Sequence, residues 1–412
     1  MNDQPRSFEP AAPEVPTHVP AELVREYEIY HMSSEKDPFK FLTQLHKDVP
    51  VFYNKYADPI ICPNGAWVVG DYELLNEVLQ DPVRFSSREM VQYSRLIGET
   101  WDMIPLELDP PDHTRIRLVV MPMFSPSRMK ALSERIERRA EALINGIKDK
   151  GECDFVEAFG LPLPVGIFLE LMDLPFDRHL EFYGWGMDII NSYDPEERKV
   201  ATSSIREYLR KILEARRAQP GEDLISQILQ STAGGEPLTD DEIIGLAFML
   251  FIGGLDTVAA TLGFAVRYLA DNPQARRDLA GNPGATSVAV EEFMRAFSVV
   301  VAKRKVVSDI DFHGAPMKAG DYVICAMALG DSDPKVFGDG LDLARSPNRH
   351  VGFGMGPHRC LGSHLARIEL KIAIDTWLRL IPEFQVKPGV PLRTHGAGGV
   401  YGYDALPLVW RA

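Results

Sequence analysis

The chain has 412 residues and a formal net charge of −15, with 45% hydrophobic and 25% charged side chains. This composition is typical of a globular protein with a large core, and the acidity excludes non-specific nucleic-acid binding, which needs a basic surface. The four cysteines lie far apart without a Cys-x-x-Cys pair, which disfavours a disulfide framework and favours a reducing compartment. The proline-rich start has no basic region followed by an apolar stretch, so we expect a cytoplasmic protein whose residues 1–16 are flexible.

The first half of the chain predicts a small sheet followed by helices. β-branched and aromatic residues at 51–53 and 66–69, bounded by Pro, Asn and Gly, predict two strands. Asp71 is a candidate N-cap for a short helix that ends near residue 79. The stretch 85–108 shows no period, and a long irregular loop in a compact protein is usually functional or mobile. Helices are predicted over 112–124 and, with short breaks, over 128–217.

The longest periodic stretch of the chain runs from 240 to 271. It begins with a capping box, Thr239 to Glu242, and stops at Asn272-Pro273. A continuous helix of this length would extend for roughly 50 Å. A membrane span needs about 20 apolar residues, but this run follows three acids and is cut by Asp256-Thr257, so a buried central helix is the better interpretation. Further elements are helices over 285–297 and 361–380, strands within 299–328 and a glycine-rich tail with β-type flanks over 396–410.

Three glycines within 352–356 form a loop that leads to Cys360, directly before the helix 361–380. A thiol at a helix start lies beside unpaired N–H groups and the positive end of the dipole, so we expect a lowered pKa and a thiolate. Such a thiolate could be a nucleophile, a redox group or a metal ligand. A zinc site is disfavoured because a single thiolate lacks a paired ligand, and a dinucleotide loop because no parallel βαβ pattern is present. The histidines that raise the zinc alternative are His350, His358 and His364.

The other motifs each allow two interpretations. Gly253-Gly254-Leu255-Asp256-Thr257 combines glycines, which cost about 1 kcal/mol each in a helix, with polar groups that are costly to bury. It could be a packing site with a structural ion pair, or a local widening that admits a ligand while Asp256 and Thr257 handle protons. Glu292-x-x-Arg295 alone is a common helix pair. His113 and Arg117 share a helix face that suits an anion or water, and Lys303-Arg304-Lys305 suits a solvated strand edge.

Together and in this order, the motifs resemble those of the cytochrome P450 monooxygenases. The stretch from Phe353 to Gly362 resembles the haem-binding loop, Glu292-x-x-Arg295 the Glu-x-x-Arg pair, and Gly253 to Thr257 the oxygen-binding motif. The resemblance implies one domain over residues 17–412, a mainly α (α+β) triangular helical prism with small antiparallel sheets and a long central helix over the haem. Stretches similar to the bacterial camphor-hydroxylase branch are Thr17-His18-Val19-Pro20, Asp109-Pro110-Pro111, Phe251 to Thr257 and Ala405 to Trp410.

The resemblance implies one haem b whose iron has the Cys360 thiolate as its axial ligand. The thiolate supplies electron density that favours O–O cleavage. Asp256 and Thr257 are implied to deliver protons to dioxygen, and Glu292 and Arg295 to lock the core near the cysteine loop. The other cofactor-binding positions that it implies, propionate partners and loop residues, are His113, Arg117, Arg304, His358, Phe353, Gly354 and Gly362.

The departures from the camphor enzyme concern the substrate and one haem contact. Trp101 stands where that enzyme has a tyrosine that donates to the substrate ketone, and Ala302 where an aspartate assists a propionate. Methionine-rich walls are adaptable, so these changes favour a compact apolar terpenoid or norisoprenoid, of ionone type, over camphor. The expected substrate-binding residues are Trp101, Met103, Met249, Ile252, Gly253, Val300 and Val400.

The implied reaction is hydroxylation of an unactivated C–H bond, with one atom of O2 entering the substrate and the other forming water. The chain shows no fused flavin or ferredoxin domain, so electrons are expected from NADH through a ferredoxin reductase and an acidic [2Fe–2S] ferredoxin that docks near Arg117. We expect no nucleic-acid partner and no membrane anchor. Two alternatives stay open, a peroxide-driven peroxygenase and a non-catalytic haem-based sensor or carrier. The intact Asp256-Thr257 pair argues against the peroxygenase.

Overall fold

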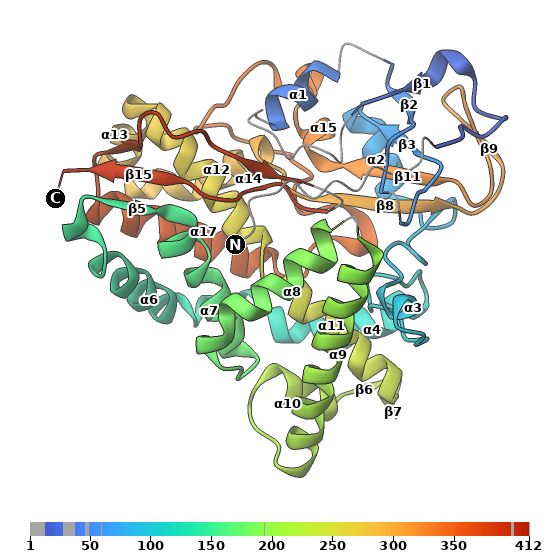
Figure 1. Ribbon diagram of the computed structural model, residues 1–412, viewed down its shortest axis with the longest axis horizontal. Coiled ribbons are helices and arrows are strands. Elements are labelled where there is room, and N and C mark those ends of the chain that lie inside the picture. The colour runs from blue at the N-terminus through green and yellow to red at the C-terminus, as the bar shows by residue number, and fades with distance from the viewer. Residues whose placement is uncertain are drawn as a thin grey trace.

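Helices make up most of the chain, and small sheets lie along the broad side of a roughly triangular outline (Figure 1). The computed structural model describes residues 13–27, 38–45, 49–58, 60–192, 194–396 and 399–411. Most of the expected flexible segment, residues 1–12, and residues 397 and 398 of the expected tail lie outside the described residues.

The helices begin where the sequence offers capping groups. The Asp71 side chain accepts hydrogen bonds from the N–H groups of Glu73 and Leu74 at the start of α2, and Thr239 and Glu242 form the predicted capping box of α11. The α-helices are α1 (Pro38–Leu45), α2 (Tyr72–Gln80), α3 (Tyr93–Leu96), α4 (Asp112–Val120), α5 (Pro126–Lys130), α6 (Ser133–Asn145), α7 (Pro162–Leu171), α8 (His179–Asn191), α9 (Pro195–Ala218), α10 (Leu224–Leu229), α11 (Asp240–Gly253), α12 (Thr257–Asp271), α13 (Pro273–Gly281), α14 (Thr286–Ala296), α15 (Met327–Asp331), α16 (Pro334–Phe337) and α17 (Ser363–Leu380).

The largest sheet has six strands in the order β1-β2-β3-β11-β8-β4. It is not purely antiparallel as expected, because β1 pairs with β2 and β11 with β3 in parallel. Parallel neighbours need a long crossover, and the helices between β3 and β11 supply it. The strands are β1 (Val24–Arg25), β2 (Val51–Asn54), β3 (Ala66–Val69), β4 (Phe85–Ser86), β5 (Glu152–Asp154), β6 (Thr232–Ala233), β7 (Glu236–Pro237), β8 (Val301–Val306), β9 (Ile310–Phe312), β10 (Ala315–Met317), β11 (Tyr322–Ala326), β12 (Phe384–Val386), β13 (Thr394–His395), β14 (Gly402–Tyr403) and β15 (Pro407–Trp410).

The region 128–217 is helical as predicted, except for one strand that the pattern did not reveal. Strand β5 pairs with β15, which pairs in turn with β12. Its three residues are too few to show a period of two, and the partner strand lies more than 250 positions later in the chain. A short strand fixed by a distant partner leaves no local signal.

The expected continuous central helix is wrong in one respect. It is two helices, α11 and α12, separated by a turn at Gly254, Leu255 and Asp256. A Cβ atom on Gly254 would lie 2.3 Å from the ring of Phe168, so a side chain there would prevent α7 from approaching. Gly254 is therefore a packing glycine. Both Gly253 and Gly254 also line the cavity described below, so the packing interpretation and the ligand interpretation both apply to this pair.

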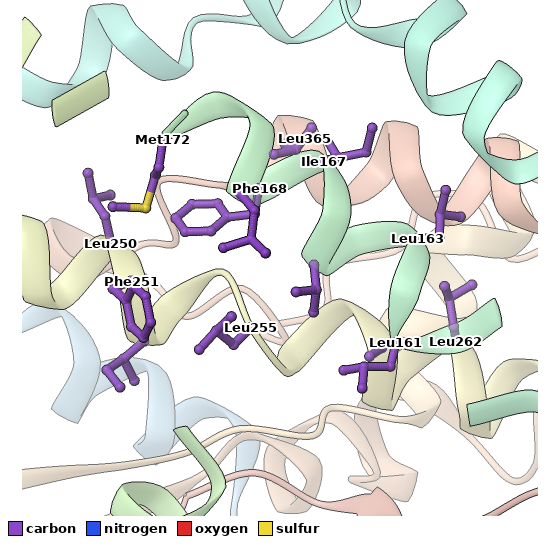
Figure 2. Close-up of a cluster of buried hydrophobic side chains, with 14 of the residues drawn as sticks. Leu161, Leu163, Ile167, Phe168, Met172, Leu250, Phe251, Leu255, Leu262 and Leu365 are labelled. Atoms are coloured by element: carbon purple, nitrogen blue, oxygen red, sulfur yellow. The ribbon is translucent and has the colours of Figure 1, made fainter. Parts of the chain in front are cut away.

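Helix α7 packs against this interruption with an almost wholly apolar surface. All residues from Pro162 to Leu169 are buried, and Figure 2 shows Phe168 and Met172 beside Leu250 and Phe251 of α11. Burying one large apolar side chain stabilises the fold by about 1.5–3 kcal/mol. The break in the central helix is thus held by a close-packed core.

The stretch Asp240–Asp271 is the one segment of the described chain that is long and apolar enough to cross a membrane. Its most apolar window is 72% buried inside the protein. Such burial is typical of a core helix, as the sequence predicted.

Candidate active site

A cavity of about 390 Å³ lies at the break in the central helix. Residues of α11, α12, β8 and α17 line it, together with the loop that carries Cys360. Most of the lining side chains are apolar, and the polar ones occur in a few groups. The cavity therefore suits an apolar ligand fixed by a small number of polar contacts.

The cysteine loop owes its shape to glycines with left-handed backbone angles. Gly354 has φ 70° and Gly356 has φ 68°, a region that glycine adopts without a steric penalty. A Cβ atom on Gly356 would also lie 2.7 Å from the carbonyl oxygen of Leu79. The loop closes where the N–H of Cys360 donates to the carbonyl of Phe353 at 2.7 Å, and this holds Cys360 in the cavity wall.

The expected lowering of the Cys360 pKa is wrong for the chain by itself. Burial raises the pKa of the thiol, and this outweighs the N–H of Gly362 and the positive charges of Arg117, Arg359 and Arg367, which lower it. Cys360 is accessible and lines the cavity, and the surrounding wall still desolvates its thiol. The sequence predicts the helix start, which lowers the thiol pKa, but not the burial of the thiol, which raises it. A bound metal ion would lower the pKa again, because a coordinating thiol is deprotonated outright.

Two imidazole rings lie in contact next to the cysteine loop. The ring centroids of His113 and His358 are 4.3 Å apart. Burial and the charge of Arg117 lower the pKa of His113 to about 4, and burial with Arg304 lowers that of His358 to about 2. Both rings are therefore neutral at pH 7. Both nitrogens of His113 and Nε2 of His358 are buried without a hydrogen-bond partner among the described residues.

Arg117 and Arg304 add two positive charges to this group. Nη2 of Arg117 donates to the carbonyl of Arg359 at 2.5 Å, and Nη1 of Arg304 to that of Lys303 at 2.7 Å. Neither guanidinium forms an ion pair with a carboxylate in the part of the chain that the structure describes. Arg304 is buried and Arg117 is half-buried. A cation that is withdrawn from water needs an anionic partner, so the two arginines and the two histidines fit the propionate groups of a haem.

The predicted solvated strand edge at residues 303–305 is wrong. Lys303 and Arg304 are both 3% exposed, and both line the cavity. Lys305, which is partly exposed, pairs with Glu89. A run of three basic residues gave no sign that two of them turn inward, because the anions that accommodate them lie far away in the sequence or outside the chain.

Asp256 and Thr257, the pair predicted to handle protons, lie at the start of α12 but differ in their access to the cavity. Thr257 lines the cavity, whereas Asp256 is 5% exposed and does not reach it. Burial raises the pKa of Asp256, and the opposing effects of His395 and the Tyr183 hydroxyl are smaller. Asp256 therefore binds a proton more readily than an exposed aspartate does, and the next residue in the chain, Thr257, lines the cavity.

Six of the seven expected substrate-binding residues line the cavity, and Trp101 does not. The indole N–H of Trp101 donates to a carboxylate oxygen of Glu99, and its ring packs against Phe248 with centroids 4.8 Å apart. The expected donor to a substrate is therefore engaged elsewhere. The six that line the cavity are Met103, Met249, Ile252, Gly253, Val300 and Val400.

Several polar residues in the cavity wall were not predicted. Tyr93 lies in the stretch 85–108, which shows no period in the sequence. Lys303 lies in the basic run 303–305, which was predicted to be a solvated strand edge. Glu369 on α17 is 2% exposed, and burial raises its pKa well above the ordinary value. No spacing rule identifies these positions, because each depends on how distant segments fold around the cavity.

The zinc alternative is not supported. No group of three or more His, Cys, Asp or Glu side chains is arranged to hold a metal ion in the described chain. His350, one of the candidate ligands, lies 3.1 Å from Glu291 instead.

Glu292 and Arg295 form a buried pair on α14. The guanidinium donates to both carboxylate oxygens at 2.8 and 2.7 Å. Glu292 also accepts from Arg345 and Asn348, each at 2.9 Å, and from the N–H of Asp342 at 2.8 Å. The pair thus joins α14 to the segment that leads into the cysteine loop.

Known proteins of one family resemble this chain over nearly its whole length. The family model described as Cytochrome P450 matches residues 187–281 and 285–395. A probable cytochrome P450 127A1 of Sinorhizobium fredii is 36% identical over 96% of this chain and 97% of the relative. Linalool 8-monooxygenase of Pseudomonas putida is 30% identical over 86% of this chain and 91% of its own length. The crystal structure of CYP101J2 matches with a TM-score of 0.85 and 33% identity, over 97% of this chain and 100% of that one.

Proposed function

The chain belongs to the cytochrome P450 family, in its camphor-hydroxylase-like bacterial branch, and is a haem-thiolate monooxygenase. From that premise we propose that it hydroxylates an unactivated C–H bond of a compact apolar terpenoid or norisoprenoid of ionone type. We further propose that residues 17–412 form a single catalytic domain in the cytoplasm. The observation that carries the proposal is the mostly apolar cavity lined by both Cys360 and Thr257.

The residues of the cavity fit one haem b. Cys360 would be its axial ligand, with Phe353, Gly354 and Gly362 forming the loop around the sulfur. His113, Arg117, Arg304 and His358 would hold the propionates, which the unpartnered ring nitrogens and unpaired guanidinium groups support. When bound, thiolate-ligated haem supplies the electron density that favours O–O cleavage.

The substrate class rests on the wall of the cavity. Met103 and Met249 are flexible thioethers that adapt to irregular ligands, and Ile252, Val300 and Val400 add branched aliphatic surface. Val300 and Val400 are also joined by a backbone bridge, so this part of the wall is rigid. The name of the relative linalool 8-monooxygenase supports a terpenoid substrate.

Thr257 and Asp256 are proposed to handle the protons of the reaction. The Thr257 hydroxyl would donate to oxygen in the cavity, and Asp256 would resupply the proton from behind. The raised pKa of Asp256, caused mainly by burial, supports this role because a carboxyl group must be protonated to act as a donor.

Replacing Thr257 with alanine should uncouple electron use from product formation. NADH oxidation should continue, but product per NADH should fall by about tenfold or more, because a positioned proton donor contributes about 10²–10⁴-fold to such steps. The electrons would appear as hydrogen peroxide. The measurement compares NADH consumed with alcohol and peroxide formed, and Thr257→Ser should restore coupling.

Unchanged coupling in Thr257→Ala would contradict the proposed role of the hydroxyl. Wild-type turnover with hydrogen peroxide but none with ferredoxin would establish the peroxygenase instead. Ligand binding without any product would favour a sensor or carrier.

Electrons are proposed to come from NADH through a ferredoxin reductase and a [2Fe–2S] ferredoxin. The docking site would include Arg117, beside the carbonyl of Arg359 in the cysteine loop. Leu118 and Met121, 63% and 49% exposed, follow it in the chain. A basic residue beside exposed apolar side chains suits an acidic partner of moderate affinity.

Replacing Arg117 with alanine should weaken both haem retention and ferredoxin-driven turnover. We expect the KM for ferredoxin to rise by roughly tenfold, which corresponds to about 1.4 kcal/mol, and the effect to shrink at high salt. Haem content and the ferredoxin dependence of turnover are the measurements. Arg115→Ala on the same helix, where Arg115 pairs with Glu242, is the matched control. An Arg117→Ala protein with normal haem content and normal turnover would contradict both roles.

A further inference from the structure

Two buried polar atoms near the break in the central helix have no hydrogen-bond partner among the described residues. They are Oδ2 of Asp256 and Nε2 of His395. The two groups also affect each other, because His395 lowers the pKa of Asp256 and Asp256 raises that of His395. An unpaired buried polar atom is costly, so an unpaired carboxyl oxygen and an unpaired ring nitrogen in the same region point to a function.

Three elements bring His395 and Asp256 into this region. His395 ends β13, and the partner strand β14 packs on α12 through the rings of Tyr403 and Phe264, whose centroids are 4.6 Å apart. Helix α8 contributes Tyr183, whose hydroxyl interacts with Asp256. The C-terminal strands of the chain therefore meet the start of α12, where Asp256 is the N-cap residue.

The other ring nitrogen of His395 lies next to the surface. Nδ1 is 2.8 Å from Oδ1 of Asp404, whose side chain is 53% exposed, whereas that of His395 is 12% exposed. A Cβ atom on Gly402 would lie 2.5 Å from Nε2, so this glycine provides the space that the ring occupies. One nitrogen of the ring thus contacts a solvated carboxylate, and the other is sealed from solvent.

The charges around His395 favour its protonated form. Burial lowers the pKa of His395, but the bond to Asp404 and the charges of Asp256 and Asp404 outweigh this and leave the pKa raised from 6.5. The other titratable group that acts on Asp256 is Tyr183, and burial raises the pKa of that phenol, so it stays protonated. An imidazole that titrates near neutral pH can both accept and donate protons.

We propose that His395 supplies protons to Asp256, along a path that begins at Asp404 on the surface and ends at Thr257 in the cavity. This rests on the proposed function and deepens it, since the reaction consumes protons. The imidazolium gives its Nε2 proton to the Asp256 carboxylate, which has just given its own proton to the Thr257 hydroxyl. Rotation of the neutral ring then presents the bare nitrogen to solvent beside Asp404, where it takes up the next proton.

This path avoids the cavity, because neither His395 nor Asp404 lines it. An apolar substrate that fills the cavity excludes water from it, and protons then need a separate route. The position of His395 outside the cavity wall therefore lets proton supply continue while substrate is bound.

The first test follows His395 by NMR in the reduced carbon monoxide complex of the holoenzyme, with isotope-labelled histidine. The signal is assigned by its loss in His395→Gln. In wild type, His395 and Asp256 should titrate as a coupled pair. In Asp256→Asn the pKa of His395 should fall, because the carboxylate charge that raises it is gone. An unchanged His395 titration in this variant would overturn the path, whatever the substrate is.

The second test measures oxidation of β-ionone by the holoenzyme with ferredoxin, reductase and NADH. In His395→Gln, kcat should fall by about tenfold or more, because a positioned proton donor is lost, and the solvent isotope effect should rise. In wild type, kcat should fall as the pH rises through the His395 titration, and this dependence should disappear in the variant. Adding His395→Gln to Asp256→Asn should have no further effect, because the path is already interrupted.

His18→Gln is the matched control, because His18 also pairs with an aspartate, Asp321, at 2.8 Å and does not line the cavity. It should leave kcat, the isotope effect and the pH profile unchanged. A normal kcat in His395→Gln, or a lower kcat with an unchanged isotope effect and pH profile, would overturn the proposal. If wild type does not oxidise β-ionone, the substrate class of the proposed function fails, while the NMR titration still decides the role of His395.

Discussion

Replacing Cys360 with serine should remove the strongly red-shifted Soret band from the carbon monoxide complex of the reduced protein. The band reports a thiolate ligand, and a serine hydroxyl is a harder and weaker ligand than a soft thiolate. Product formation should fall by more than about 100-fold, because loss of outer-shell partners alone costs about 10–100-fold at metal sites. The measurements are the reduced carbon monoxide spectrum, the haem content and the turnover number.

Cys153 provides the matched control for that experiment. It lies partly buried in β5, where it pairs with Leu408 and does not line the cavity. Cys153→Ser should keep the red-shifted band and the turnover of wild type. A red-shifted band that persists in Cys360→Ser would show that another residue ligates the iron, and the assignment of the cysteine loop would be wrong.

The cysteine loop was predictable because its constraints are local. Gly354 and Gly356 need left-handed angles, and the helix that follows Cys360 has a clear period. The capping box at Thr239 and the Asp71 cap are local in the same sense. Where neighbouring residues fix the backbone, a pattern in the sequence carries enough information to place the element.

The pKa of Cys360 and the burial of Lys303 were not predictable because they depend on distant segments. The helix start predicts a lowered thiol pKa, but burial by the surrounding fold reverses the sign. Lys303 finds its carboxylate at Asp58, 245 positions away. A run of basic residues predicts a solvated segment, because no local pattern in the sequence indicates that a distant residue will provide a buried counterion.

The substrate-binding part of the cavity also shows that local sequence patterns do not predict features that depend on loop conformation. The resemblance to the camphor enzyme predicted that Trp101 lies in the cavity wall, but its N–H donates to a local partner, Glu99, instead. Tyr93 takes a place in the wall from a stretch with no period. The motifs thus identify the chemistry of the site, whereas residues that fix specificity depend on loop conformations with little sequence signal.

Replacing Glu292 with alanine should lower the free energy of unfolding by about 3–5 kcal/mol, the usual cost of leaving a buried charge without its partner. Glu292 is fully buried and Arg295 is 4% exposed. Arg295 also donates to the carbonyls of Asp331 and Gly340 at 2.6 and 3.0 Å, so it cannot turn to solvent without breaking these bonds. A domain is stable by about 5–15 kcal/mol, and the variant should therefore fold but lose haem readily.

The pH dependence of stability distinguishes the contribution of the Glu292–Arg295 ion pair from that of apolar packing, which does not change with pH. Burial raises the pKa of Glu292, but the bonds from Arg295, Asp342 and Arg345 outweigh it and leave the pKa lowered from 4.5. A lowered carboxyl pKa stabilises the fold above the unfolded value, and the contribution is lost as the pH falls from 4.5 through the folded value. The stability difference between wild type and Glu292→Gln should therefore shrink in acid.

Denaturant unfolding followed by circular dichroism, at pH 7 and at steps below pH 4.5, measures both effects. Glu207→Ala is the control, because Glu207 pairs with Lys211 at 2.8 Å on the exposed surface of α9, and such exposed pairs contribute little to stability. If Glu292→Ala were no more destabilising than Glu207→Ala, the pair would not hold the segment before the cysteine loop. The position of Cys360 would then have to depend on the glycine loop and α17 alone.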